Sequence, residues 1–571
     1  MKNLEVARIL YEIADILELQ DVKFKPAAYR RAARNIENLP EDIEEVYKNG
    51  KLENIPGVGK NISKKIAEYL KTGKLKYYEK LKKKSPAHIE ELLNISGIGP
   101  KLAKRLYKEL KIKNIEDLKK AIKQHKLEKL ERMGTKAEEN ILRGIENVQT
   151  KRMLLGLALP TALEIEKRLN NLKEVETASL AGSIARRKET IGDIDILVCS
   201  TKPEIVMNFF TKMSDVKNIL ASGETKSSVV LKNGIQIDLR IVPRSSYGSA
   251  LQYFIGSKEH NIKLRQIALK KGYKLNEYGL FRKKDNKKVA GYRQEDIYRK
   301  LGLSYIEPEM RENRGEIECA QKHKLPKLIK YGSLKGDLHM HTKWSDGSAT
   351  IEKMAEAAKK LGYEYIAITD HVGLSVARAM DEKRLKRQIS EIRKIDKKTG
   401  GIKILAGAEI DIKPDGSLAL SRQMLKQLDI RIGAIHSRFK SSKSEMTQRI
   451  VRALSSGYID ILAHPTGRLI QKRNPYDVDL DKIFQTAKDN KVVMEINSMP
   501  ERLDLNDINI KKALEFKLKF SINTDSHNAE NLHFAELGIA TARRGWAQAK
   551  DVVNTGGFNE LKKFFTHSFK Y

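Results

Sequence analysis

The sequence predicts a multidomain fold: helical N-terminal domains, a mixed α+β domain, a small α/β domain and a C-terminal (β/α)7 barrel. Three observations support this prediction. The chain has 571 residues, which is too long for a single hydrophobic core. A glycine-centred helical repeat occupies residues 1–150, and β-rich runs such as DIDILVCS follow it. From about residue 333, apolar strands and helices alternate regularly to the C-terminus.

The charge of the chain favours a polyanionic partner. Lys and Arg number 109 against 74 Asp and Glu, which gives a formal net charge of +35. Such an excess is costly in self-repulsion unless a polyanion offsets it, and nucleic acid is the commonest polyanion. A lysine-rich proteome or the charged surface of a thermophilic protein is the alternative explanation of the charge alone.

Other bulk features argue against a secreted or membrane-spanning protein. Cys199 and Cys319 are the two cysteines and cannot form a disulfide framework, so a reducing cytoplasm is expected. The N-terminal segment contains acidic residues, unlike a signal peptide. No apolar run approaches the ~20 residues needed to cross a bilayer. We therefore expect a cytoplasmic, nucleoid-associated monomer.

A glycine hairpin is repeated in the N-terminal region. IPGVGKNISKKIAEYL at 55–70 returns as ISGIGPKLAKRLYKEL at 95–110, with a weaker third copy at 130–145. The glycines permit a tight turn whose N–H groups face outward at a helix start, and this forms an anion site. Gly-x-Gly also simply ends helices, but two copies followed by basic helices favour contacts with the DNA backbone. The expected DNA-binding residues here are Gly57, Gly59, Lys60, Gly97, Gly99 and Lys101.

Three carboxylates lie on neighbouring predicted strands of the β-rich region. Asp193 and Asp195 alternate along one strand and therefore face the same side of it. Asp238 lies in the apolar run IQIDLRIV, where an unpaired acid would be costly. With the Gly182-Ser183 turn and arginines nearby, the three acids suit two-metal phosphoryl transfer with Mg²⁺ or Mn²⁺. Exposed acids on an edge strand would explain the first two but not Asp238.

These features resemble the family X DNA polymerases, the group that contains DNA polymerase beta. The resemblance spans about residues 1–317. It rests on the Gly-Ser, nine residues, Asp-x-Asp signature of nucleotidyltransferases, the paired hairpins and YFIGSKEHNIKLR at 253–265. It implies that the three carboxylates bind the catalytic metal ions, and that monovalent cations bind at the hairpins. Ala185 departs from the family, which often has arginine there. The nucleotide-binding residues implied are Gly182, Ser183, Arg186 and Gly192 at the triphosphate, Tyr253 and Phe254 at the sugar, Asn261 at the base and Arg265 at the template side.

The same resemblance implies a 5′-deoxyribose-phosphate lyase site in the N-terminal region. Lys65 matches the Schiff-base lysine of the family, and a lysine among other cations has a lowered pKa and can attack a sugar aldehyde. Lys25 and Tyr29 match members of the pocket for the 5′-phosphate. Asn61 and Phe24 replace a basic residue and a histidine of that pocket. The alternative role of Lys65 is a contact with the DNA backbone alone.

Polar residues follow nearly all of the seven apolar strands that can be recognised from about residue 333 onward. The first strand ends in His339 and His341, and two later strands end in His436 and His464. Strand–helix units with functional side chains at the strand C-termini are typical of a closed parallel barrel with its site at that end. A lone histidine after a strand is usually structural, but six of the twelve histidines of the chain fall at such positions.

This constellation resembles the PHP (polymerase and histidinol phosphatase) domain over about 333–571. The nine ligands of that family map onto His339, His341, Asp346, His371, Glu409, His436, His464, Asp525 and His527. Imidazoles and carboxylates without thiolates suit two or three Zn²⁺, Mn²⁺ or Fe²⁺ ions, which activate water and stabilise the leaving oxygen of a phosphoester. In bacterial and archaeal X polymerases the domain is associated with 3′→5′ exonuclease and with abasic-site or 3′-end processing. Arg438 and Arg468 are further candidates for binding the scissile phosphate.

The patterns together predict a gap-filling DNA polymerase for base excision repair that uses dNTPs and carries a metal-dependent phosphodiesterase. One alternative is a DNA repair nuclease whose polymerase region mainly binds DNA. Another is a phosphatase acting on small phosphate esters. The expected domains are a lyase-like helical domain at 1–85, a second helical DNA-binding domain at 86–150, a nucleotidyltransferase palm at 151–245, a nascent-base-pair-binding thumb at 246–317, a linker at 318–332 and the PHP barrel at 333–571.

Overall fold

The structure is a computed structural model. It describes residues 2–19, 22, 24–37, 39, 43–83, 92, 100–112, 114–124, 126–127, 130, 141, 152–373, 375–376 and 378–565. The chain divides into two compact units. The first comprises Met1–Arg152 and Lys258–Val289, and the second comprises Met153–Ser257 and Ala290–Tyr571.

The first unit begins with short helices around a core that includes Leu10, Ile13 and Ile66. The glycine hairpin lies directly before one of these helices. Gly57 has a φ of +85°, which favours glycine, and Gly59 is the N-cap of the helix Lys60–Thr72. Gly97 and Gly99 of the second hairpin lie outside the described residues. The helices are α1 (Lys2–Leu19), α2 (Lys25–Glu37), α3 (Ile43–Lys48), α4 (Lys60–Thr72), α5 (Lys76–Lys83), α7 (Pro100–Leu110, which includes the backbone of Lys101) and α8 (Ile115–Lys123).

The thumb region, which follows the palm in sequence, contributes a further helix and hairpin to the first unit. Helix α14 (Lys258–Lys270) precedes β8 (Tyr273–Asn276) and β9 (Gly279–Arg282), which pair antiparallel. With β10 (Lys288–Ala290) they form a three-stranded sheet in the order β10-β9-β8. Helix α15 (Gln294–Lys300) follows in the second unit.

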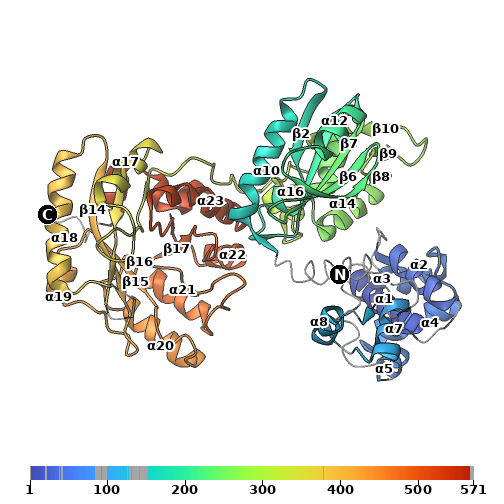
Figure 1. The fold of residues 1–571 in the computed structure, drawn as a ribbon, viewed down its shortest axis with the longest axis horizontal. Helices are drawn as coiled ribbons and strands as arrows, with labels where there is room; N and C mark the ends of the chain where they lie inside the picture. Colours follow the sequence, from blue (N-terminus) through green and yellow to red (C-terminus); the bar gives the residue numbers. More distant parts are fainter. Residues whose placement is uncertain are drawn as a thin grey trace. The chain divides into compact units, whose positions relative to one another are not determined.

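A five-stranded sheet in the order β2-β4-β7-β6-β5 forms the palm of the second unit (Figure 1). Only the β4–β7 pair of this sheet is parallel. Along β4, Ile194 and Ile196 join the core beneath α10 and α12, whereas Leu197 and Cys199 pack against α13. The pleat therefore turns Asp195 to the α13 side. The elements are α10 (Leu155–Asn170), β2 (Val175–Leu180), α11 (Gly182–Ala185), β4 (Asp193–Ser200), α12 (Pro203–Thr211), β5 (Val216–Ser222), β6 (Lys226–Leu231), β7 (Gln236–Val242) and α13 (Arg244–Ile255).

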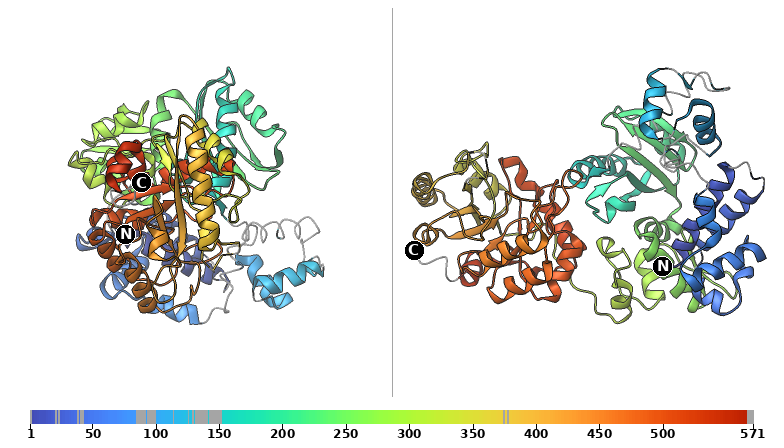
Figure 2. Two further views of the ribbon diagram at one scale, coloured as in Figure 1. Left: turned by 90° about the vertical axis from the view of Figure 1, so that its left-hand side faces the viewer. Right: turned by 90° about the horizontal axis from the view of Figure 1, so that it is seen from below.

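A parallel barrel completes the second unit and confirms the predicted fold class. Its strands follow the order β11-β12-β14-β15-β16-β17-β18, with β13 beside β14, and a parallel bridge from Met340 to Ser526 nearly closes it. Figure 2 shows helices outside the strands in the yellow-to-red segment. The strands are β11 (Gly336–Asp337), β12 (Tyr365–Ile368), β13 (His371–Val372), β14 (Lys403–Asp411), β15 (Ile430–Ala434), β16 (Ile461–Leu462), β17 (Val493–Asn497) and β18 (Phe520–Asn523). The main helices are α17 (Ile351–Lys360), α18 (Glu382–Lys398), α20 (Lys443–Leu454), α21 (Leu480–Asp489), α22 (Asp507–Glu515), α23 (Ala535–Arg544) and α24 (Phe558–Phe564).

The palm and the barrel share a hydrophobic core. Leu503 and Leu537 of the barrel join the apolar cluster of the palm. A Cβ at Gly156 of α10 would lie within 3 Å of the side chains of Pro500 and Leu537, so the two domains meet closely there. The expected linker 318–332 also packs on the barrel, because Ile329 is buried in its core and donates its N–H to Ala547 O at 3.0 Å. Among the described residues, no helix has the length and apolarity that a membrane crossing requires.

We expect Leu537→Ala to lower the free energy of unfolding of the second unit by about 2–5 kcal/mol, because it opens a cavity in the shared core. The control is Leu163→Ala on α10, whose leucine is 42% exposed. It should change this free energy by less than about 0.5 kcal/mol. Urea unfolding followed by circular dichroism measures both, and equal effects would show that the contact between palm and barrel contributes little.

Candidate functional site

The side chains predicted as barrel ligands converge at the C-terminal ends of the strands, around Glu409. This carboxylate lies near the C-terminal end of β14 and is 1% exposed. Its Oε1 lies 2.9 Å from His464 Nε2 and 3.2 Å from His436 Nε2. Its Oε2 lies 2.7 Å from His371 Nδ1 and 3.6 Å from His341 Nε2. One buried acid thus contacts imidazoles from four different strand ends.

The remaining predicted ligands complete the cluster. Asp525 Oδ1 lies 3.0 Å from His341 Nε2, and Asp346 Oδ2 lies 3.3 Å from His527 Nε2. His339 Nε2 lies 3.5 Å from Glu409 Oε2. The structure therefore brings all nine together. Within them, three groups have ligand atoms within 4.8 Å of one another: His341, Asp346, His371 and His527; His339, His341 and Glu409; and His371, Glu409 and His436.

The donor chemistry of this cluster fits divalent metal ions. His339 Nε2 and His341 Nε2 lie 3.2 Å apart. A neutral imidazole has a lone pair at one of its two nitrogens, so each of these Nε2 atoms can serve as a metal ligand. Glu409 Oε2 and His436 Nε2 are buried without a hydrogen bond. Burial, reinforced by His371, lowers the pKa of His341 to about 4, which favours the neutral form that binds metal. Burial alone would raise the pKa of Glu409, but the surrounding histidines hold it well below its usual range.

Residues behind the ligands orient them. Glu495 Oε1 lies 2.7 Å from His339 Nδ1, and Asp411 Oδ1 lies 2.8 Å from His436 Nδ1, so in each ring the Nε2 lone pair can face the cluster. Asp370 holds the loop before Asp346, because it accepts hydrogen bonds from the backbone N–H groups of residues 342 and 345. These roles were not predicted from the sequence. The available signal was a second polar residue two positions from a ligand, as in Glu409-x-Asp411.

The two arginines suggested for the scissile phosphate differ in their surroundings. Arg468 is buried and is already engaged. Its Nε donates to Arg502 O at 2.8 Å, and its Nη2 donates to Leu503 O and to Glu189 Oε2 of the palm, both at 2.7 Å. Arg438 is exposed. Arg468 thus connects barrel and palm.

In the palm, the parallel register places Asp195 opposite Asp238 on the α13 side of the sheet. Gln236 Nε2 donates to Asp238 Oδ1 at 2.8 Å, and Lys226 Nζ lies 3.7 Å from Asp238 Oδ2. Burial, then the charges of Asp193 and Asp238, raise the pKa of Asp195 to about 7. Three acids gathered in this way fit divalent cations, because a cation relieves the repulsion among them.

Gly182 permits the tight approach of its turn to this acid. Its φ is +59°, and a Cβ added to it would overlap the Asp195 carboxylate. Any other residue would therefore displace either the turn or Asp195. Ser183 follows in α11, and Gly192 directly precedes β4. The Gly-Ser turn and the acids thus form one compact arrangement, as the motif spacing predicts.

The other residues expected to bind the nucleotide divide between the two compact units. Tyr253 and Phe254 lie on α13 with ring centroids 5.2 Å apart, and the Arg240 guanidinium lies 4.9 Å from the centroid of Phe254. Asn261 and Arg265 lie on α14 of the other unit. Arg186 follows α11, and its Nη1 donates to the carbonyls of residues 182 and 255 at 3.2 and 2.6 Å.

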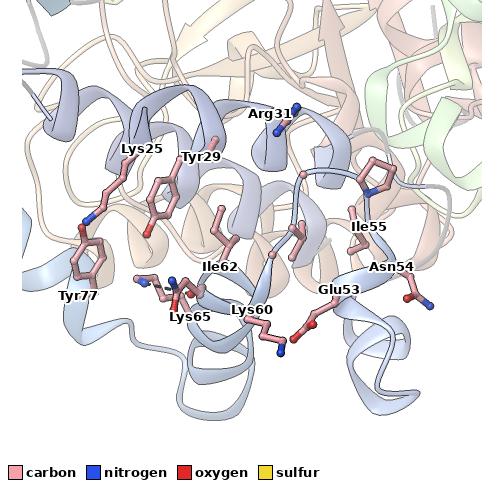
Figure 3. A pocket seen from close by; sticks show the side chains of 16 residues that line it. Lys25, Tyr29, Arg31, Glu53, Asn54, Ile55, Lys60, Ile62, Lys65 and Tyr77 are labelled. Carbon is pink, nitrogen blue, oxygen red and sulfur yellow. Dashed lines mark hydrogen bonds between the residues drawn. The ribbon is translucent and has the colours of Figure 1, made fainter. Parts of the chain in front are cut away.

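A cavity of about 680 Å³ lies beside the first glycine hairpin (Figure 3). Lys65 Nζ donates to Asn61 O at 3.2 Å and lies 4.6 Å from the centroid of the Tyr77 ring. Burial and then the charge of Lys25 lower the pKa of Lys65. Phe24 is 89% exposed and is absent from the cavity wall. The predicted residues that line the cavity are Lys25, Tyr29, Gly57, Gly59, Lys60 and Lys65. Tyr77, which sequence analysis missed, also lines it.

We expect His341→Ala to lower the Mn²⁺ or Zn²⁺ content by about one ion per chain, because this imidazole belongs to two of the three groups. His533→Ala, which removes an exposed histidine outside them, should leave the content unchanged. Inductively coupled plasma mass spectrometry after gel filtration measures the ratio. Full metal content and affinity in His341→Ala would contradict the assignment of this cluster as a metal centre.

Comparisons with known proteins agree with this architecture. Family models match as follows: "Helix-hairpin-helix domain" at 1–75, "SAM-like Helix-hairpin-helix tandem" at 89–147, "DNA polymerase beta thumb" at 250–312 and "PHP domain" at 337–499. The sequence predicted DNA-binding hairpins, a thumb and a PHP barrel in these regions.

Relatives match the whole chain or one part of it. "DNA polymerase/3'-5' exonuclease PolX" of Bacillus subtilis (strain 168) is 37% identical over 570 residues, 99% of each chain. A "Probable phosphatase" of Thermoanaerobacter sp. (strain X514) is 30% identical over 231 residues, 38% of this chain and 89% of that protein. DNA polymerase lambda of Rattus norvegicus is 24% identical over 342 residues, 54% of this chain and 56% of that protein. The chain belongs to the family X DNA polymerases that carry a C-terminal PHP domain.

Proposed function

We propose that this protein is a DNA-directed DNA polymerase that fills gaps in base excision repair and also removes or cleaves damaged ends with its barrel. The observation that carries the proposal is the presence of two separate candidate metal centres in one unit. One is formed by the three palm carboxylates on the α13 side of the sheet, and the other by the nine side chains at the barrel mouth. The relative from Bacillus subtilis is named as a DNA polymerase and a 3'-5' exonuclease, which supports one polymerising and one hydrolytic centre.

In the polymerase reaction, Asp193, Asp195 and Asp238 would hold Mg²⁺ or Mn²⁺. Bound ions would supply charge neutralisation for transfer of the nucleotidyl group from a dNTP to the primer 3′-OH with loss of pyrophosphate. Gly182 keeps the turn close to Asp195, and Arg186 adds positive charge beside it. Tyr253 and Phe254 of α13, with Gly182, Ser183, Arg186 and Gly192 of the same unit, would orient the nucleotide. The roles of Asn261 at the base and Arg265 at the template side remain predictions from the sequence. The aromatic pair before Gly256 can stack on the sugar and exclude a 2′-OH.

In the nuclease reaction, the nine barrel side chains would hold two or three Zn²⁺, Mn²⁺ or Fe²⁺ ions. Such ions would supply an activated water and stabilise the leaving oxygen of a phosphodiester. Glu495 and Asp411 fix the rings of His339 and His436. Arg502 Nε lies 3.3 Å from Asp525 Oδ2 and fixes that carboxylate. The reaction proposed is 3′→5′ exonuclease or cleavage at abasic sites.

The hairpin regions would bind the DNA backbone, with monovalent cations at the hairpins. In the first hairpin, the side chain of Lys60 and the glycines Gly57 and Gly59 would supply the contacts. Gly97, Gly99 and Lys101 are the corresponding residues predicted from the sequence for the second hairpin. A monomer in the cytoplasm, close to the nucleoid, is the setting we propose. The expected domain boundaries remain predictions.

The experiment that tests the two centres is a gapped primer–template assay. Asp195→Asn removes a carboxylate from the palm, so extension should fall by about 10³-fold or more while 3′-end degradation continues. His341→Ala should have the reverse effect, because it alters only the barrel cluster. A wild-type protein that degrades DNA but adds no nucleotide would identify a nuclease whose polymerase region binds DNA. Loss of both activities in either variant would contradict two independent sites.

The N-terminal cavity is the site that we propose for a 5′-deoxyribose-phosphate lyase. Its amine, Lys65 Nζ, would attack the sugar aldehyde and release water to form a Schiff base, and elimination would then expel the 3′-linked phosphate. Lys25 and Tyr29 line the same cavity and would bind the 5′-phosphate. The lowered pKa of Lys65 supports this role, because the attacking form is the neutral amine.

We expect borohydride to trap a covalent adduct on a 5′-deoxyribose-phosphate end in the wild type and not in Lys65→Ala. Lys25→Gln removes a positive charge that lowers the pKa of Lys65. That pKa should rise, so the pH profile of trapping should shift to higher pH. Lys64→Ala on the same helix lies outside the cavity and should leave the profile unchanged. An adduct that persists in Lys65→Ala would contradict the assignment.

A further inference from the structure

Glu312 lies between two arginines, one from the palm and one from the barrel. Its Oε1 accepts a hydrogen bond from Arg186 Nε at 3.0 Å and another from Arg544 Nη1 at 3.1 Å. The three side chains are almost enclosed, with exposed fractions of 13% for Glu312, 12% for Arg186 and 7% for Arg544. Burial alone would raise the pKa of Glu312, but Arg544 and then Arg186 hold it below its usual range. The carboxylate is therefore a shared anion between two domains.

Arg544 also fixes the backbone of Arg186. It is the last residue of α23, and its Nη1 donates to Arg186 O at 2.6 Å. Its Nη2 donates to Asp507 Oδ2 at 2.6 Å, and Arg314 Nη1 lies 3.2 Å from the same oxygen. The Arg544 guanidinium is thus held by Asp507 of the barrel. At the same time it contacts Glu312, the partner of the Arg186 side chain, and the carbonyl oxygen of Arg186. Lys188 is a further cation whose charge acts on Glu312.

Arg186 itself stands beside the palm carboxylates. Its charge lowers the pKa of Asp195 against the effect of burial. Its Nη1 donates to Gly182 O in the Gly-Ser turn and to Ile255 O at the end of α13. That helix also carries Tyr253. A change in the position of Arg186 would therefore alter three features together: the Gly-Ser turn, the end of α13 and the electrostatic field at Asp195.

The division of one carboxylate between two guanidinium groups has an electrostatic consequence. With Arg544 present, Glu312 is shared, and Arg186 keeps a net positive charge that can attract the phosphates of a nucleotide. Without Arg544, Glu312 would neutralise Arg186 alone, and the carbonyl of Arg186 would lose its tether. Both changes would weaken the attraction of a triphosphate, and neither removes any of the three palm carboxylates.

We propose that Arg544, a residue of the barrel domain, is a positioning residue for the nucleotide site of the palm and acts through Glu312 and Arg186. The inference rests on the proposed polymerase function. It makes the barrel a structural part of dNTP binding, besides the hydrolytic role proposed for its metal cluster.

The adjacent arginine provides a matched control. Arg543 lies on the same helix, and it is similarly buried and paired. Its Nε donates to Glu309 Oε1 at 2.7 Å and its Nη1 donates to Ile329 O at 2.8 Å. Its ion pairs are with Glu307 and Glu309, in place of Glu312. Arg543→Gln therefore removes a positive charge from the same helix but leaves the contacts among Arg544, Glu312 and Arg186 in place.

The test compares full-length Arg544→Gln and Arg543→Gln in gapped-primer extension and in binding of a fluorescent dATP analogue. We expect Arg544→Gln to raise the KM and the Kd for the nucleotide by about tenfold, the loss typical of one charge-assisted contact, with a smaller change in kcat. Arg543→Gln should stay within about twofold of the wild type. Thermal unfolding and hydrolysis of bis(p-nitrophenyl) phosphate by the barrel with Mn²⁺ verify that both variants remain folded.

A second substitution distinguishes positioning from a loosened interface. In Arg544→Gln/Glu312→Gln, the acid that would neutralise Arg186 is absent, so the nucleotide KM should return toward the wild-type value. A loosened interface would make the double variant worse than either single one, and this result would overturn the inference. So would equal KM values in Arg544→Gln and Arg543→Gln. If Arg544→Gln does not fold, Arg544→Lys, which cannot bridge all three partners, replaces it. A wild type that binds the nucleotide but extends no primer would instead overturn the proposed function.

Discussion

Both candidate sites depend on the parallel pairing of strands. Side chains alternate between the two faces of each strand, so the register of the pairing decides which side chains meet. In the palm, β4 and β7 run parallel in a register that sets Asp195 opposite Asp238, and the pleat turns both to the same side. In the barrel, the ladders are parallel throughout, so the carboxyl ends of all strands meet at one mouth. A shift by one residue would turn the acids into the apolar core.

The parallel pairing brings charged and polar side chains close together, where they repel one another and exclude water from one another. Glu409, His339 and His341 are almost fully buried within a few ångströms of each other, and the pKa of Asp195 is raised by its burial and its acidic neighbours. Polar groups in such a position are destabilising unless hydrogen bonds or cations offset the cost. Glu495 and Asp411 supply part of the compensation from behind. The inward-facing atoms that remain have the donor chemistry of metal ligands.

A second consequence concerns the relation between palm and barrel within the second unit. Apolar side chains such as Leu503 and Leu537 close the palm core from the barrel side. Ion pairs lie around this contact: Arg468 joins Glu189 of the palm, and Glu312 joins Arg186 to Arg544. Only the Glu312 cluster is buried, and there a broken pair would leave an uncompensated charge. The two domains are therefore bound to each other by packing and oriented by charge.

The sequence alone determined the fold class and the residue types of both clusters. Short motifs carry this information locally: Gly182-Ser183 and Asp193-x-Asp195 fix a turn and a pleat, and His339-x-His341 marks a strand end. The sequence could not identify Glu495 as the partner of His339, Tyr77 beside Lys65, or Arg468 as a contact with the palm. Each of these contacts depends on which distant segments of the chain meet. His339 and Glu495, for example, are 156 residues apart in the sequence. Local patterns report periodicity and turn chemistry, whereas contacts between distant side chains arise only when the chain packs, and for that reason the tertiary structure alone decided them.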